Sequence, residues 1–94
     1  MNDTEMIADL VKVGETRITE SLREAAKDAK SELALDFGSI KRLDSEAVAA
    51  LRELADCAER KNIRVVLYSV NVDLYKVLKL VNLTPRFSFV NEEQ

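Results

Sequence analysis

The stretch LDFGSIKRLDSEAVAALRELA, from Leu35 to Ala55, decides the fold of this chain. Its first residues end an apolar run, ELALDF at 32–37, that is typical of a short β-strand. A polar turn follows at 38–43, and from Ser45 to about Arg60 apolar residues recur at three- and four-residue spacing, which predicts an amphipathic helix. The stretch therefore predicts a strand, a turn and a helix, with Asp44 and Ser45 at the start of the helix.

The next segment, IRVVLY from Ile63 to Tyr68, is an almost continuous apolar run that is rich in β-branched residues. Such a run is typical of a strand buried on both faces of a sheet. Strand, helix and strand then form a βαβ unit, which we expect to be parallel and right-handed. Further on, Asn71 and Asp73 suit the start of another helix, and RFSFV at 86–90 alternates as a short final strand does. The apolar stripe of that helix consists of Leu74, Val77, Leu78 and Val81.

The segment before the opening stretch adds one more strand and one more helix. We interpret MIADLVKV, from Met6 to Val13, as a strand, although its imperfect alternation also fits a helical turn. TESLREAAKDAK, from Thr19 to Lys30, is interpreted as a helix. Ser21 and Glu24 have the S-x-x-E spacing of a capping box at its start. The predicted fold class is α/β, with the order β-α-β-α-β-α-β in one small domain over residues 1–94. We expect a mixed, mostly parallel sheet of about four strands with about three helices packed on it, and a frayed tail at 91–94.

The composition excludes most kinds of self-sufficient enzyme. The chain has no histidine, a single cysteine (Cys57) and two glycines, Gly14 and Gly38. Without histidine, Ser-His-Asp and Cys-His catalysis and histidine-based zinc sites are impossible, and one cysteine cannot form a zinc site alone. Two glycines this far apart cannot form a Walker loop or a G-x-G-x-x-G motif. We therefore predict that the protein is not an enzyme and has no catalytic residue, metal or cofactor.

Charge and hydropathy narrow the choice of partner and compartment. The formal net charge is -3 and the pI is about 5.0, whereas nucleic acids and anionic lipid surfaces both attract basic proteins. The chain begins with the acidic segment MNDTEMIADLV and contains no apolar run of membrane-spanning length. We expect a cytoplasmic protein that binds another protein, that does not bind nucleic acid and that does not insert into a membrane.

Ser45 has three possible interpretations at its position after Asp44. Asp and Ser are both favourable N-cap residues, so the pair can simply start the helix. A nucleophilic serine would need a base in place of histidine; Lys41 could supply one, but no oxyanion-hole glycine accompanies it. A phosphoacceptor is the third interpretation, because free backbone N–H groups and the positive end of the helix dipole stabilise a phosphate at this position. Phosphorylation would add about -1.5 to -2 charge to a docking surface.

From Leu33 to the C-terminus the chain resembles the STAS family, the domain of sulfate transporters and anti-sigma factor antagonists, most strongly over 33–90. The resemblance runs through LALDFGSIKRL, the Asp44 and Ser45 pair, EAVAALRELADCAERKN, IRVVLYSV, VDLYKVLKLVNL and RFSFV. In antagonist members a strand leads into Asp-Ser-Ser/Thr-Gly-Leu-Gly, and the serine directly after the aspartate is phosphorylated. That position is Ser45 here. Glu46 replaces the second Ser/Thr, and Ala47 and Ala49 replace the glycines.

The resemblance implies a regulatory module of bacterial signalling and transcription, an anti-sigma factor antagonist. Its Asp44 and Ser45 face would dock on an anti-sigma serine kinase that sequesters a sigma factor. The kinase would phosphorylate Ser45, and the added charge would end docking. The expected docking residues are Asp44 and Glu46, together with the basic Lys41 and Arg42 of the preceding turn.

Two alternatives remain open beside the antagonist. The chain also fits a stand-alone STAS subunit of an Mla-type phospholipid ABC transporter, docked on the transporter ATPase through the same helix without required phosphorylation. The run SVNVDLYKVLKLVNL, at 69–83, resembles that branch. Some STAS domains have been proposed to bind nucleotides, but this sequence offers no phosphate loop for that role.

Overall fold

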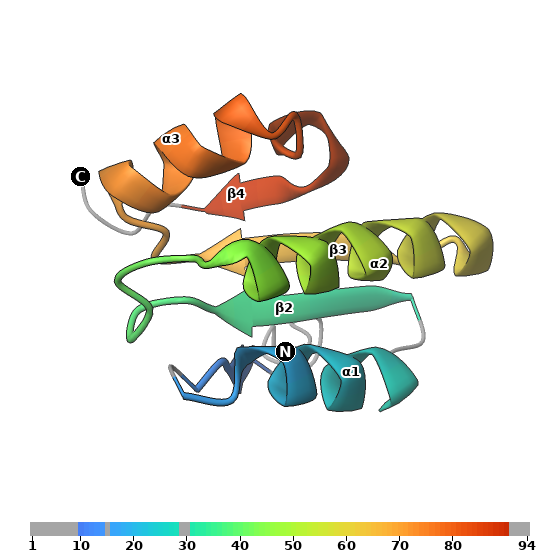
Figure 1. Ribbon diagram of the computed structural model, residues 1–94. Coiled ribbons are helices and arrows are strands. Elements are labelled where there is room, and N and C mark those ends of the chain that lie inside the picture. Colours follow the sequence, from blue (N-terminus) through green and yellow to red (C-terminus); the bar gives the residue numbers. More distant parts are fainter. Residues whose placement is uncertain (1–9, 15, 29–30, 91–94) are drawn as a thin grey trace, which may run out of the picture.

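The computed structural model describes residues 10–14, 16–28 and 31–90, and these residues follow the predicted order β-α-β-α-β-α-β (Figure 1). Part of the predicted first strand (6–9), the end of the predicted first helix (29–30) and the tail 91–94 lie outside the described residues. The elements are β1 (Leu10–Lys12), α1 (Ile18–Asp28), β2 (Glu32–Asp36), α2 (Ser45–Lys61), β3 (Arg64–Tyr68), α3 (Val72–Leu80), the 3-10 helix η2 (Thr84–Arg86) and β4 (Ser88–Val90).

The four strands pair in their chain order, β1-β2-β3-β4, and every pair is parallel. Leu35 of β2 lies opposite Val11 of β1 and Leu67 of β3, which fixes the register. Each strand reaches its neighbour through a helical crossover, and such crossovers are right-handed, so successive helices lie on the same face of the sheet. Figure 1 shows α2 in front of β2 and β3 and α1 below β2, and the two helices contact each other.

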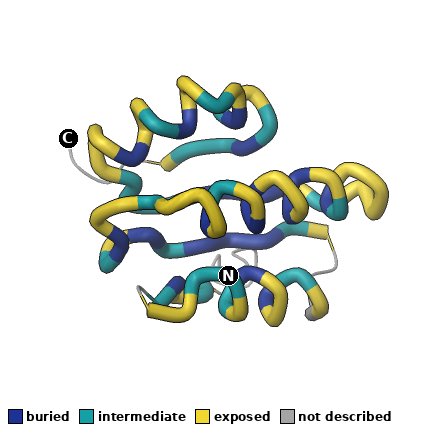
Figure 2. Tube along the Cα trace, viewed as in Figure 1, coloured by how far each residue is buried: buried dark blue, intermediate teal, exposed yellow. Residues whose placement is uncertain are grey.

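The core lies between that face of the sheet and the helices. Leu35 and Leu67 on the strands and Leu51 on α2 are completely buried, and α1 and α3 add buried leucines to the same cluster. In Figure 2 the buried segments of the helices turn toward the strands, while their outer faces are exposed. Ala34 and Val66 are also buried, although they lie on the opposite face of the sheet, outside the core cluster. The predicted burial of β3 on both faces therefore holds at its centre, whereas Arg64, on the same face as Val66, is exposed.

Helix α2 begins and ends as its sequence predicts, because its two caps are local. The side chain of Asp44 accepts a hydrogen bond from the N–H of Ala47 at 2.9 Å, which satisfies a backbone donor of the first turn. At the other end Asn62 adopts a left-handed conformation (φ 62°) and donates its N–H to the carbonyls of Ala58 and Glu59. Asp44 is therefore the N-cap, and Ser45 is the first helical residue.

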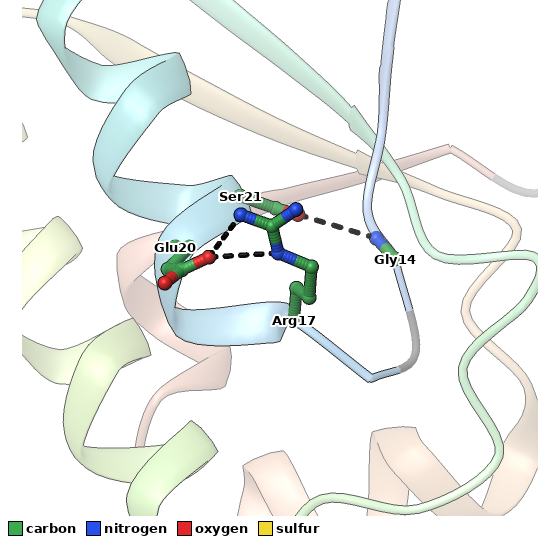
Figure 3. A network of polar contacts seen from close by, with 4 residues as sticks. All are labelled: Gly14, Arg17, Glu20 and Ser21. Atoms are coloured by element: carbon green, nitrogen blue, oxygen red, sulfur yellow. Dashed lines mark hydrogen bonds and ion pairs between the residues drawn. The ribbon is translucent and has the colours of Figure 1, made fainter.

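The predicted capping box of the first helix is wrong. Helix α1 already begins at Ile18, so Ser21 lies inside it and cannot be its N-cap. The Arg17 N–H donates to the carbonyl of Gly14 at 3.2 Å, and this turn starts the helix earlier than the S-x-x-E spacing requires. The hydroxyl of Ser21 instead accepts a hydrogen bond from the N–H of Gly14 at 3.4 Å, which ties α1 to the end of the first strand segment (Figure 3).

The C-terminal part of the chain is close to its prediction. Asn71 is the N-cap of α3, and its side chain accepts a hydrogen bond from the N–H of Leu74 at 2.8 Å. The final strand is shorter than RFSFV, because Arg86 belongs to η2, which has Pro85 in its first turn.

Among the described residues, no helix is both long and apolar enough to cross a membrane.

Candidate functional site

The residues predicted to bind a partner gather where α2 begins, and we call this surface the α2 tip. It lies at the carboxyl ends of the parallel strands, which is where ligands bind in open α/β sheets. All of its residues are exposed, including the hydroxyl-bearing Ser45. The α2 tip consists of Lys41, Arg42, Asp44, Ser45 and Glu46.

Asp44 caps the start of the helix, whereas the hydroxyl of Ser45 does not. Asp44 uses a carboxylate oxygen to cap the N–H of Ala47, and its backbone carbonyl accepts from Val48 at 3.0 Å. Ser45 follows as an exposed residue of the first turn, and within the described part of the chain its hydroxyl makes no hydrogen bond. The cap interpretation of the pair is thus confirmed for Asp44 and wrong for Ser45, whose hydroxyl is not needed to start the helix.

The loop that carries the basic residues is held in place at several points. The carboxylate of Asp36 accepts a hydrogen bond from the N–H of Gly38 at 2.8 Å, which forms a tight turn after β2. Ile40 is 1% exposed, and its carbonyl accepts a hydrogen bond from the side-chain amide of Asn71 at 3.3 Å. Leu43 packs against the core further along. The two basic residues of the α2 tip therefore project from between two anchored positions.

The start of α1 forms the other wall of this site, and none of its residues was among the predicted site residues. A hollow of about 350 Å³ lies between Thr16–Glu20 and the first turn of α2, where Asp44, Glu46 and Ala47 line it. Arg17 and Glu20 form an exposed ion pair on its rim (Figure 3), and the hydrogen bond from Arg17 to Glu20 raises the pKa of the Arg17 guanidinium. Parallel βα units begin their helices at the same sheet edge, and that rule could have predicted this neighbour.

The charges of the α2 tip balance one another before any modification. Lys41 and Arg42 offset Asp44 and Glu46, and no ion pair that involves these four residues is found in the described ranges. A phosphate on Ser45 would shift this balance to about -1.5 to -2. A single modification would therefore turn a neutral surface into a strongly acidic one.

A parallel sheet with helices on one face and an exposed polar helix tip defines a small α/β domain that presents a surface to other molecules. The family model described as "Mlab, STAS domain" matches residues 13–87, so the chain belongs to the STAS domain family. The match includes α1, whereas the resemblance in the sequence began only at Leu33. Domains of this family act through protein interactions and are generally non-catalytic. A search of curated proteins finds no match to the chain.

Proposed function

We propose that this protein is a regulatory interaction module that docks on a protein partner through the α2 tip and is switched by phosphorylation of Ser45, as in anti-sigma factor antagonists. The observation that carries the proposal is the exposure of Ser45 beside a cap that it does not form. Because Asp44 supplies the cap, a phosphate can be added to Ser45 without loss of that hydrogen bond. The helix start then accommodates the phosphate through its dipole.

In this function the protein is the substrate of a partner serine kinase in the cytoplasm. The kinase brings ATP, and the oxygen of the Ser45 hydroxyl bonds to the γ-phosphorus while the bond to ADP breaks and the hydroxyl proton passes to the kinase. The added charge repels acidic groups of the partner and the adjacent Asp44 and Glu46, so docking ends. Lys41 and Arg42 reduce this repulsion within the α2 tip and contact partner carboxylates in the unmodified state.

This function predicts that a serine-kinase anti-sigma factor is encoded beside this protein. The test incubates the protein with that kinase and ATP and analyses the product by mass spectrometry. We expect one phosphoryl group on Ser45, and none on the Ser45→Ala variant. In a titration with the same kinase, Ser45→Asp should bind about tenfold more weakly or worse, which corresponds to about 1.4 kcal/mol. Ser45→Ala should bind as the unmodified protein does. Unmodified Ser45 after prolonged incubation, or equal affinity of the aspartate variant, contradicts the switch.

A second function is favoured by the description of the matched family, which names Mlab. The protein would then be the STAS subunit of an Mla-type phospholipid ABC transporter and would dock on its ATPase. Glu46, Ala47 and Ala49 also favour this function, because they depart from the antagonist motif. Docking would still use the α2 tip, but phosphorylation of Ser45 would not be required.

The two functions differ in their predicted gene neighbours and in their predicted response to variants. A neighbouring ABC permease and ATPase, with co-purification of that ATPase, supports the transporter subunit. Arg42→Glu should abolish that co-purification, while Ser45→Ala should leave it unchanged. Failure of both the kinase and the ATPase to bind any form of the protein would contradict the α2 tip as a docking surface.

A further inference from the structure

A second exposed surface lies at the opposite edge of the sheet from β1, between α3 and β4 (Figure 1). It contains a hollow of about 440 Å³, which Val70 and Asn71 line at the end next to β3. We call the other lining residues the α3–β4 patch: Val72, Tyr75, Lys76, Lys79, Phe89 and Val90. In the described part of the chain five large apolar residues are exposed, and three of them line this hollow. They are Val72, Tyr75 and Val90, which are 69%, 42% and 39% exposed. Clustered exposed apolar residues with a polar rim are typical of interaction surfaces.

The apolar floor of the patch is held in a fixed shape. The rings of Tyr75 on α3 and Phe89 on β4 pack edge to face, with centroids 5.3 Å apart and an angle of 76° between their planes. Phe89 also packs against the core, so the pair is fixed from below. A binding surface that is ordered before its partner arrives loses less conformational entropy on association.

The rim of the patch has one sign of charge, in contrast to the chain as a whole. Lys76 and Lys79 are exposed beside the hollow, and among the described residues no carboxylate lines it, although the chain carries a net charge of -3. A segment that combines apolar side chains with carboxylates complements this surface. Two copies of the patch would bring lysines face to face, which disfavours self-association through it. The chain's own residues 91–94 (NEEQ) supply carboxylates but no apolar side chain.

Strand β4 adds main-chain groups to the patch. Among the described strands β4 pairs only with β3, and the Ser69 N–H donates to the carbonyl of Val90 at 3.3 Å. Since the N–H and C=O groups of a strand residue point to the same side, those of Phe89 point to the outer edge. An extended partner segment can therefore hydrogen-bond to Phe89 while one of its side chains enters the hollow beside Tyr75.

We propose that the α3–β4 patch is a second docking surface, and that its occupant is a short extended segment of another protein in which large apolar side chains are flanked by carboxylates. The patch is separate from the α2 tip and does not depend on the state of Ser45. The protein would thereby hold two partners, or two parts of one partner, at two different surfaces.

Two synthetic peptides of ten residues test the charge preference. One has two leucines flanked by glutamates, and the other has the same leucines flanked by lysines. Amide chemical shifts of the protein are followed as each peptide is added. We expect the acidic peptide to bind about tenfold more tightly, with shifts on α3 and β4 and weaker binding in high salt. No saturable binding of the acidic peptide, equal affinity for the two, or shifts confined to other elements would overturn the proposal.

A matched pair of variants on α3 tests the place of binding. Val72→Gln and Leu80→Gln each replace an exposed aliphatic residue, but only Val72 lines the hollow. We expect Val72→Gln to weaken the acidic peptide about fivefold or more, and Leu80→Gln to change its affinity less than about twofold. Lys76→Glu should reverse the preference between the peptides, and Ser45→Asp should change neither affinity. Equal effects of Val72→Gln and Leu80→Gln on the affinity of the acidic peptide would contradict binding at the α3–β4 patch. This conclusion would hold whether or not Ser45 is phosphorylated.

Discussion

The two ends of α2 use their charged side chains differently. Toward the C-terminal end Arg86 of η2 donates hydrogen bonds to Asp56 at 2.8 Å and to Glu59 at 3.1 Å. Near the middle of the helix, Arg52 donates to the carbonyl of Val81 at 3.4 Å. At the α2 tip the charged side chains form no ion pair with another element within the described residues. The same helix is thus fastened to its neighbours at one end and presents its charges at the other.

This difference supports the proposal that the α2 tip serves binding, whereas the C-terminal end of α2 serves folding. Charged side chains that pair across elements hold α2 against η2, and the hydrogen bond with Asp56 raises the pKa of the Arg86 guanidinium. A partner would have to break those pairs before it could use the same groups. At the α2 tip a partner would have no ion pair with another element to break among the described residues, and only the cap formed by Asp44 is already in use. We therefore expect substitutions at the C-terminal end to change stability and substitutions at the α2 tip to change docking.

The largest effect should follow from Leu51→Ala, because both ends of α2 depend on one rigid helix. Leu51 is completely buried in the core cluster, so its truncation removes transfer free energy and leaves a cavity. We expect a loss of about 2–5 kcal/mol in the free energy of unfolding, measured by urea denaturation. Glu53→Ala, at an exposed position of the same helix, should change it by less than about 0.5 kcal/mol. Similar losses for both variants would contradict the core assignment.

A smaller effect should separate Asp44 from Ser45 within the α2 tip. Asp44→Ala removes the cap of Ala47 and should cost about 1 kcal/mol in the free energy of unfolding. Ser45→Ala removes an exposed hydroxyl that does not cap and should cost less than about 0.5 kcal/mol. Thermal or urea unfolding of both variants measures the difference. If Ser45→Ala costs as much as Asp44→Ala, Ser45 shares the cap and its phosphorylation would destabilise the helix start.

Local signals in the sequence were sufficient for α2 and β3. The apolar spacing after Ser45 and the run IRVVLY each encode a length and a buried face, and both elements occur as predicted. The start of α1 could not be read in the same way, because the link from Gly14 to Ser21 satisfies a backbone group that belongs to the preceding segment. Nor could the sequence assign the cap within the Asp44 and Ser45 pair, since either side chain can accept that hydrogen bond.

The remaining parts of the surface depend on contacts between distant residues. The hollow beside the α2 tip is lined by both Arg17 and Glu46, which belong to two different βα units. Arg86 pairs with two carboxylates of α2 that lie 30 and 27 residues away along the chain. No local sequence pattern predicts these contacts between residues that are far apart in the chain. The position of the α2 tip at the carboxyl ends of the strands follows from the parallel βαβ order. The sequence therefore predicted where the candidate site lies, but it did not predict all of the residues that form it.

A smaller loss of stability than that of Asp44→Ala should follow from Arg86→Ala, and this variant tests the comparison between the ends of α2 most directly. The loss should be below that of Asp44→Ala, because the partner carboxylates are exposed and water screens these ion pairs. It should shrink further in about 1 M salt, measured by thermal unfolding at two salt concentrations. Pairing raises the pKa of the Arg86 guanidinium, so the stability that Arg86 contributes is fully present below its unfolded pKa and is lost only in strong alkali. The contribution of Arg86 to the free energy of unfolding should therefore be constant between about pH 6 and 9.

Arg42→Ala is the matched control, because it should leave the unfolding temperature unchanged at both salt concentrations but weaken docking. Arg86→Ala should leave docking intact. If Arg86→Ala weakens docking as much as Arg42→Ala does, the partner covers both ends of α2 and the division between them is wrong.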